Sequence, residues 1–223
     1  MFYLAFLLNQ LPAAADSVKF LRIIRLECND VAIGTSTQST EGHDMTSQTV
    51  LTCTCGQVAL EVQGAPIVSV ECLCADCQSA GTFLRTLPGA SSTLDEKGAT
   101  SFVLYRKDRV WCRKGQDLLR EHRLSKDSST RRVIASCCNT AMFLEFTSGH
   151  WLSIYGGLWP AANLPALELR TMTRSRREGV VLPDDVPNPS THTFSFYGKL
   201  FRAWAAMGFR APKVDVNGSL EAK

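Results

Sequence analysis

Three clusters of cysteine restrict the folds open to this chain, because each cluster offers several metal ligands within one short segment. Seven of the nine cysteines belong to Cys53-Thr54-Cys55, to Cys72-Leu73-Cys74-Ala75-Asp76-Cys77 or to the pair Cys137-Cys138. Thiolates two or three positions apart can bind one ion, and zinc takes about four ligands in a tetrahedron. Seven sulfurs are too many for one such site and one short of two closed sites.

The nine cysteines could instead form a disulfide framework, as they do in small secreted domains. A chain of 223 residues does not need disulfides to fold, and C-x-C or C-x2-C pairs close tiny, strained loops when they are oxidised. The first eight residues are apolar, but no basic residue precedes Lys19, as a secretory signal would require. We therefore expect reduced, metal-binding thiols in a cytoplasmic protein.

The composition indicates a globular protein with one domain and extensions, or at most two small domains. Hydrophobic residues make up 45% of the chain and charged residues 20%, and no run approaches the roughly 18 to 20 apolar residues of a membrane-spanning helix. The net charge of +3 is too small to indicate a nucleic-acid partner. Between Ser101 and Ala135, ten Lys and Arg stand against four Asp and Glu. A solvated basic strand pair is the favoured interpretation, and an anion-binding surface the alternative.

The chain changes character twice along its length. Residues 1–45 are an apolar leader followed by a polar linker, and we expect this segment to be poorly ordered. Residues 46–160 contain many short alternating segments separated by turns, which predicts a mainly β, mostly antiparallel domain. Residues 161–223 form a C-terminal extension with one amphipathic helix. The apolar positions of this helix, which we expect to pack on the protein's own core, are Phe196, Leu200, Trp204 and Met207. Its expected caps are Ser195 and Gly208.

The cluster of Cys72, Cys74 and Cys77 places three thiolates within six residues. A loop around one zinc would supply three sulfurs and leave the fourth position to water or an incoming thiol, as catalytic zinc sites do. Alternatively, a distant ligand completes a closed structural site. The spacing alone does not separate these two possibilities.

Cys53 and Cys55 need partners from elsewhere in the chain, and Cys137 and Cys138 form the other available pair. Four thiolates would close a structural site that contributes directly to folding. Adjacent residues on an extended strand point to opposite faces, so both late cysteines can reach one metal only where the backbone turns. The following Asn139-Thr140 makes a turn plausible.

These residues carry a resemblance to the glutathione-dependent formaldehyde-activating enzyme family, also called the centromere protein V domain family. The similar motifs are C-x-C-G-x-V at Cys53 and, seventeen residues after Cys55, C-x-C-x2-C at Cys72, with Gly64-Ala65-Pro66 between them and Gly81 after them. The resemblance covers roughly residues 49–146.

The resemblance implies a β-tent-like fold stabilised by two zinc ions. Cys53 and Cys55 would join late cysteines at a structural zinc, and Cys72, Cys74 and Cys77 would hold a labile or catalytic zinc. This chain departs from the pattern at the late motif, where Ala135 stands in place of the first late cysteine. Either Cys137 substitutes from a shifted position or the structural zinc has three sulfurs.

The resemblance also implies a carbon–sulfur lyase or synthase that acts on a small-molecule thiol such as glutathione, with S-hydroxymethylglutathione as product. A zinc with three thiolates is electron-rich and suits delivery of a thiolate better than activation of water. Arginines would help to bind the carboxylates of glutathione. The candidates are Arg85, Arg113, Arg131 and Arg132.

The rival hypothesis is a non-catalytic zinc module that binds a partner. We expect Cys112 to be a core residue, and the four histidines to lie at the surface or in loops.

Overall fold

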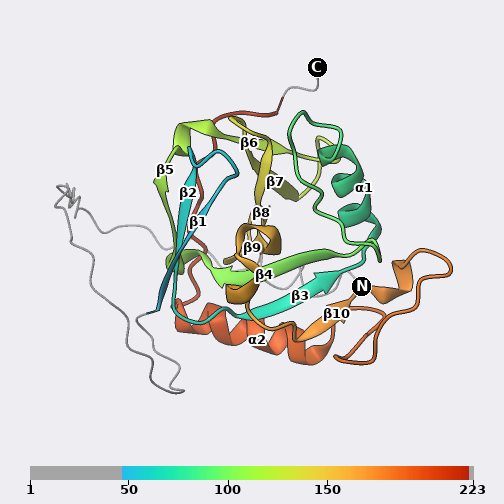
Figure 1. Ribbon diagram of the computed structural model, residues 1–223. Coiled ribbons are helices and arrows are strands. Elements are labelled where there is room, and N and C mark those ends of the chain that lie inside the picture. Colours follow the sequence, from blue (N-terminus) through green and yellow to red (C-terminus); the bar gives the residue numbers. More distant parts are fainter. Residues whose placement is uncertain (1–46, 221–223) are drawn as a thin grey trace. The chain divides into compact units, whose positions relative to one another are not determined.

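The computed structural model describes residues 47–220, which form short strands joined by turns and two α-helices (Figure 1). The expected leader, 1–45, with Cys28 and His43, lies outside the described residues. The elements are β1 (Gln48–Thr52), β2 (Ala59–Gln63), β3 (Val68–Cys72), α1 (Ala75–Leu84), β4 (Thr100–Arg106), β5 (Val110–Lys114), β6 (Leu119–His122), β7 (Thr130–Ala135), β8 (Thr140–Phe146), β9 (Trp151–Tyr155), β10 (Leu169–Thr171) and α2 (Phe194–Ala206).

The strands form two sheets. One has three strands in the order β1-β2-β5, and the other has seven in the order β10-β3-β4-β9-β8-β7-β6. Neighbouring strands within these sheets pair antiparallel, except that β10 pairs parallel with β3. The predicted class is therefore confirmed: the protein is mainly β, mostly antiparallel, with a C-terminal helix and cysteine clusters that could bind zinc.

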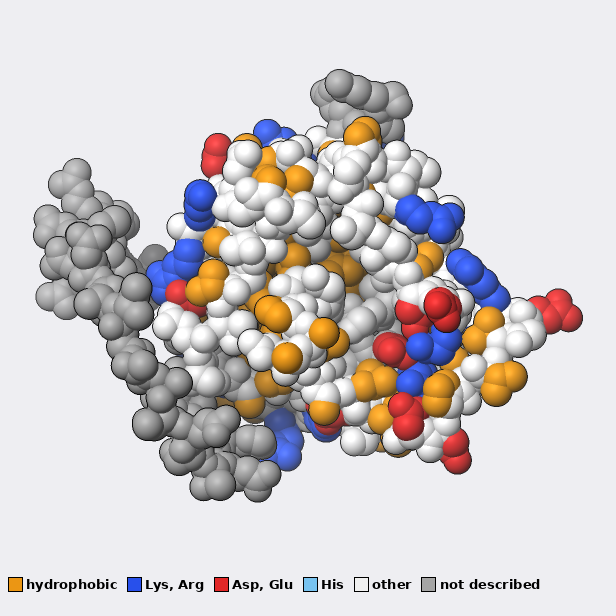
Figure 2. Space-filling view, viewed as in Figure 1, with side chains coloured by type: hydrophobic (Ala, Val, Ile, Leu, Met, Phe, Trp, Pro, Cys, Tyr) orange, Lys and Arg blue, Asp and Glu red, His pale blue; other side chains and the backbone are white. Residues whose placement is uncertain are grey.

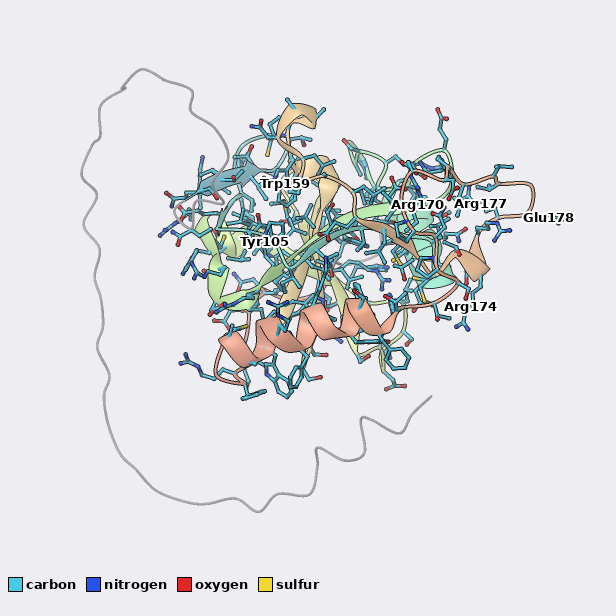
Figure 3. The ribbon with its side chains drawn as sticks, turned by 90° about the horizontal axis from the view of Figure 1, so that it is seen from below. Tyr105, Trp159, Arg170, Arg174, Arg177 and Glu178 are labelled. Carbon is cyan, nitrogen blue, oxygen red and sulfur yellow. The ribbon has the colours of Figure 1, made fainter. Side chains whose placement is uncertain are left out.

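Apolar residues of both sheets form two packed clusters. The first joins β1 and β2 to β4, β7, β8 and β9, and it includes Tyr105 stacked on Trp159, both labelled in Figure 3. The second lies between the seven-stranded sheet, α1 and α2, and it includes Cys72 and Cys77. Burial of this kind stabilises a fold by about 25 cal/mol per Å² of apolar surface removed from water. Cys53, Cys72 and Cys77 are thus part of the apolar core.

Helix α1 was not predicted, because the segment that holds Cys72, Cys74 and Cys77 was expected to be a loop, and a glycine such as Gly81 is unfavourable within a helix. Gly81 is instead buried inside the helix, where a Cβ would lie 2.5 Å from Leu94 Cγ. The glycine therefore serves close packing of a neighbouring loop on the helix and does not end it. The helix begins directly after Cys74, whose Sγ accepts the N–H of Cys77 as an N-terminal cap.

Helix α2 confirms the predicted amphipathic helix and its packing on the protein's own core. Phe196, Leu200 and Ala203 are buried along one side. The expected cap at Ser195 was wrong by two residues: Thr193 caps the helix, and its Oγ1 accepts the N–H of Phe196 at 3.1 Å. Threonine and serine both cap a helix through a side-chain oxygen, so which of them caps α2 depends on where the chain turns into the helix. In Figure 1, α2 lies along β3 and β4.

Half of the ten basic side chains between Ser101 and Ala135 form ion pairs within the described residues. Arg113 pairs with Glu61, and Arg131 pairs with Glu121 and Glu145. On the face shown in Figure 2, acidic and basic side chains are interspersed. Arg174 and Arg177, which are labelled in Figure 3, are exposed in the segment after β10. Among residues 47–220, no helix is long and apolar enough to cross a membrane.

Candidate functional site

Four cysteines from two distant segments come together in what we call the four-cysteine group: Cys53, Cys55, Cys137 and Cys138. Their Sγ atoms all lie within 4.8 Å of one another. The Sγ atom of Cys137 lies 3.8 Å from that of Cys53, 3.3 Å from that of Cys55 and 3.8 Å from that of Cys138. Zinc–sulfur bonds of about 2.3 Å in a tetrahedron separate sulfurs by about 3.8 Å. The group therefore has the dimensions of a closed tetrahedral zinc site.

Two tight turns produce this arrangement. In the turn between β1 and β2, the N–H of Gly56 donates to the Cys53 carbonyl, and Gly56 has a positive φ of 71° that suits glycine. The N–H of Val58 donates to Cys53 Sγ at 3.2 Å. In the turn between β7 and β8, Asn139 takes the left-handed conformation with φ 56°. Because adjacent residues of an extended strand face opposite sides, this turn is what allows Cys137 and Cys138 to share one site.

Thr140 joins the two turns. Its Oγ1 accepts the N–H of Thr54 at 3.1 Å, lies 2.9 Å from Thr54 Oγ1 and lies 3.0 Å from Cys138 Sγ. Burial opposes ionisation, but hydrogen bonds from Thr140 and Thr54 lower the pKa of Cys138. Burial, together with contacts to Cys55 and Cys53, raises the pKa of Cys137. The hydroxyl pair thus favours one thiolate in the group before any metal binds.

The second cluster is the three-cysteine group: Cys72, Cys74 and Cys77, with Sγ atoms within 4.8 Å of one another. Cys72 ends β3, where β10 holds it: Thr171 stands opposite Cys72, and its carbonyl accepts the N–H of Leu73. Cys74 caps α1, and Cys77 lies in the first turn of that helix. Among the described residues, no fourth His, Cys, Asp or Glu side chain joins this group.

Electrostatics concentrate negative charge on Cys74. Hydrogen bonds from Cys72 and Cys77 lower the pKa of Cys74, with a smaller contribution from Arg132, whereas the hydrogen bond to Cys74 raises the pKa of Cys72. The cap position adds the positive end of the α1 dipole, which also favours a thiolate. The three-cysteine group therefore combines one preferred thiolate with two thiols beside it.

A cavity of about 380 Å³ opens at the three-cysteine group. Its walls come from the seven-stranded sheet on one side and from α2 with the segment before it on the other. Apolar side chains dominate these walls, and the polar groups include Arg132, Thr171 and His192. Pockets of this size, mostly apolar with a few polar groups, are typical of small-molecule sites.

Arg132 is the arginine that the structure brings to this cavity. Successive residues of a strand face opposite sides, so Arg131 turns to Glu121 and Glu145 while Arg132 turns to the cysteines. Arg132 is 1% exposed, and its Nη2 donates to the Asp76 carbonyl at 3.2 Å. Within the described residues, its Nε and Nη1 have no hydrogen-bond partner. The other candidates lie elsewhere: Arg113 pairs with Glu61, and Arg85 ends α1 and is exposed.

His192 and Thr171 line the cavity and were not predicted, because no metal-ligand spacing marks them. Thr171 Oγ1 lies 2.8 Å from His192 Nδ1, and the His192 ring stacks on Phe196 at 4.6 Å. Burial lowers the pKa of His192, which keeps the ring neutral near pH 7. These two contacts fix the position of the ring in the wall of the cavity.

The remaining candidates fall outside both groups. Cys112 is half-buried against the first apolar cluster, and the eight described cysteines are free thiols. His122 stacks on Phe83, within β6, and His150 is 8% exposed and hydrogen-bonded to the Leu200 carbonyl. His150 lies in the loop between β8 and β9, as expected, but its side chain is buried between β9 and α2. His122 differs from the expectation of a loop, because it is the half-buried last residue of β6.

Comparisons with known proteins add little to this geometry. No family model matches the sequence, and no curated protein matches it. A crystal structure of a Rhodobacter sphaeroides protein, determined as a structural-genomics target, is similar at 13% sequence identity with a TM-score of 0.38. The match covers 53% of this chain and 97% of that chain. Function must therefore be argued from the cysteine groups and the cavity.

Proposed function

We propose that this protein binds two zinc ions and is a divergent member of the glutathione-dependent formaldehyde-activating enzyme family. In this proposal the four-cysteine group is structural, and the three-cysteine group catalyses carbon–sulfur bond formation or cleavage on a glutathione-type thiol adduct. One observation carries the proposal: the group with three sulfurs opens on a cavity, whereas the group with four sulfurs is complete without a ligand.

The residues present suit zinc. Thiolates are soft ligands that select zinc and other thiophilic metals over magnesium or calcium, and the sulfur separations in the four-cysteine group match a tetrahedral ion. The free state of the described cysteines suits a reducing compartment, and we propose the cytoplasm. When bound at Cys72, Cys74 and Cys77, zinc would supply a positive charge that lowers the pKa of an incoming thiol.

The chain's own residues would prepare this site for the reaction. The thiol sulfur adds to the carbonyl carbon of formaldehyde, a C–S bond forms, and the thiol proton ends on the carbonyl oxygen; the lyase direction reverses each change. The Arg132 guanidinium would balance the negative charge of the thiolates and orient an oxygen of the substrate through Nε or Nη1. The apolar walls would keep water from the adduct.

Replacing one ligand of the three-cysteine group tests the proposal. In Cys74→Ser, the serine oxygen can still cap α1, so the fold should persist. We expect the metal content to fall from two zinc ions per chain to one, unchanged circular dichroism, and loss of glutathione-dependent formaldehyde turnover. Cys112→Ser is the matched control, because Cys112 belongs to neither group, and it should retain both ions and full turnover.

A different outcome would favour the non-catalytic zinc module. If the purified protein shows no glutathione-dependent turnover, and Cys74→Ser unfolds it as any core ligand loss would, the three-cysteine group is structural and the enzyme proposal is wrong.

A further inference from the structure

We infer that the sulfur compound taken by the cavity carries an apolar substituent about the size of an aromatic ring, and that α2 supplies the wall that selects it. This inference rests on the proposed function, because it names the substrate class of the three-cysteine group. It goes beyond a reaction of formaldehyde with glutathione alone.

The first argument is the chemistry of the walls. The sheet contributes Phe102, Leu104 and Leu144, and α2 contributes Phe196, Tyr197 and Leu200. Most of these side chains also belong to the second apolar cluster, so they are held by packing and cannot turn away to expose polar groups instead. A wall of this kind stabilises a bound apolar group by removing its surface from water, and it gives a polar group few hydrogen-bond partners.

The second argument is size and charge. A cavity of about 150 Å³ accepts benzene, and this one has about 380 Å³. The single carbon of formaldehyde leaves that volume unfilled. Glutathione carries two carboxylates, yet Arg132 is the one Lys or Arg among the residues that line the cavity. The walls therefore suit an apolar group next to the sulfur better than a second carboxylate.

The third argument is the rim. Tyr197 on α2 and Phe146 on β8 line the cavity, yet 48% and 40% of their surfaces are exposed. Phe146 packs against Trp151, another lining residue, with ring centroids 5.4 Å apart. Aromatic rings at an open mouth can close over a ligand ring by offset or edge-to-face contact. Helix α2 also lies outside residues 49–146, which carry the family resemblance, so this wall is a feature of this chain's C-terminal segment.

Isothermal titration calorimetry on the zinc-loaded protein tests the inference with two thiols. Benzyl mercaptan carries an aromatic ring, and 2-mercaptoethanol carries a hydroxyl group in its place. We expect benzyl mercaptan to bind at least about tenfold more tightly, since each apolar group that fits a hydrophobic pocket changes affinity by about tenfold or more. Equal affinities would overturn the inference.

Two variants on α2 test whether this helix causes the preference for the aromatic thiol. Tyr197→Ala removes a lining ring, and Phe201→Ala removes a ring of the same helix that is 58% exposed and does not line the cavity. Both positions are exposed enough for the fold to tolerate alanine. We expect Tyr197→Ala to weaken benzyl mercaptan about fivefold or more and to leave 2-mercaptoethanol within twofold, while Phe201→Ala changes neither. Equal weakening of both thiols by Tyr197→Ala would contradict a selective wall.

Benzyl alcohol separates this inference from the proposed function, because it has the ring without the thiol. If benzyl alcohol binds as tightly as benzyl mercaptan, and Tyr197→Ala weakens both, the apolar cavity is supported and thiol chemistry at the cysteines is not. If both thiols bind equally and neither depends on Tyr197, the thiol site stands and the apolar selection is wrong.

Discussion

The two cysteine groups differ in solvent exposure and in the number of sulfurs, and the more exposed group is the one with four sulfurs. In the four-cysteine group Cys55 is exposed and Cys137 and Cys138 are half-buried, whereas in the three-cysteine group Cys72 and Cys77 are buried. The more exposed group is nevertheless complete, because its four sulfurs fill a tetrahedron. The more buried group lacks a fourth sulfur and faces a cavity. We therefore expect reactivity toward a ligand to depend on the number of sulfurs and on an adjoining cavity, and not on exposure.

The two groups also connect different parts of the fold. The four-cysteine group links the β1–β2 turn of the three-stranded sheet to the β7–β8 turn of the seven-stranded sheet. The three-cysteine group involves the end of β3 and the start of α1, which are already neighbours in the chain. A metal that joins distant segments removes more freedom from the unfolded chain, so it should stabilise the fold more.

The largest expected effect is the loss of stability in Cys53→Ser. Cys53 is 2% exposed and lies 3.8 Å from Cys137 across a gap of 84 residues. Since structural zinc supplies about 10 kcal/mol or more in small domains, we expect a loss of the order of 5 kcal/mol, or about 10–20 °C in Tm. Cys74→Ser should lower Tm by only about 5 °C or less. Thermal unfolding with a zinc count measures both, and equal losses of Tm would break the distinction between the groups.

The next effect concerns the charge beside the three-cysteine group. Arg132→Met keeps the length of the side chain and removes its charge, so the thiolates lose their nearby cation. We expect zinc to bind this group about tenfold more weakly, the usual size for a residue next to the ligands, with the four-cysteine group unchanged. Competition with a chelator should show two release steps, of which one shifts. Arg85→Met, at the exposed end of α1, is the control. A shift of both steps would indicate a general loss of fold.

The smallest effect is a pH dependence in the sheet that carries Cys53. Hydrogen bonds from Arg113 at 2.8 and 2.7 Å, opposed by burial, lower the pKa of Glu61 to about 2. Because the folded-state pKa is below the unfolded value of about 4.3, this stability is present above pH 4.3 and is lost as the pH falls toward 2. Arg113 is half-exposed, so the contribution is about 1 kcal/mol.

Urea unfolding of wild type and Glu61→Gln from pH 7 to pH 3 measures this contribution. The variant should be about 1 kcal/mol less stable at pH 7, and the difference should shrink as the pH falls. The effects of acid on the thiolates cancel in that difference. A gap that stays constant with pH would show that the carboxylate's charge plays no part.

Local sequence patterns predicted the β class of the domain and one of the two helices. The short alternating segments of residues 46–160 and the stripe from Phe196 to Leu200 repeat with the periods of a strand and a helix, and such periods need no distant partner. Helix α1 was not predicted, because Gly81 is required by its close packing against Leu94, and local periodicity does not show such a contact. The cavity residues Thr171 and His192 were not predicted for the same reason, since they lie 94 residues or more beyond Cys77, the last cysteine of the three-cysteine group.

The sequence by itself determined that this chain is mainly β and that its cysteines stand in short segments that could bind a metal, because strand alternation and C-x-C spacing are local properties. The sequence offered Cys137 and Cys138 as the available partners of Cys53 and Cys55, but only the tertiary structure placed the four sulfurs within 4.8 Å of one another and brought Arg132 to the other three cysteines. Cys137 reaches Cys53 because the β7–β8 turn lies next to the β1–β2 turn, and Arg132 faces the thiols because strand pairing sets which side of β7 is inward. Long-range register depends on packing across the whole sheet, which no local pattern contains.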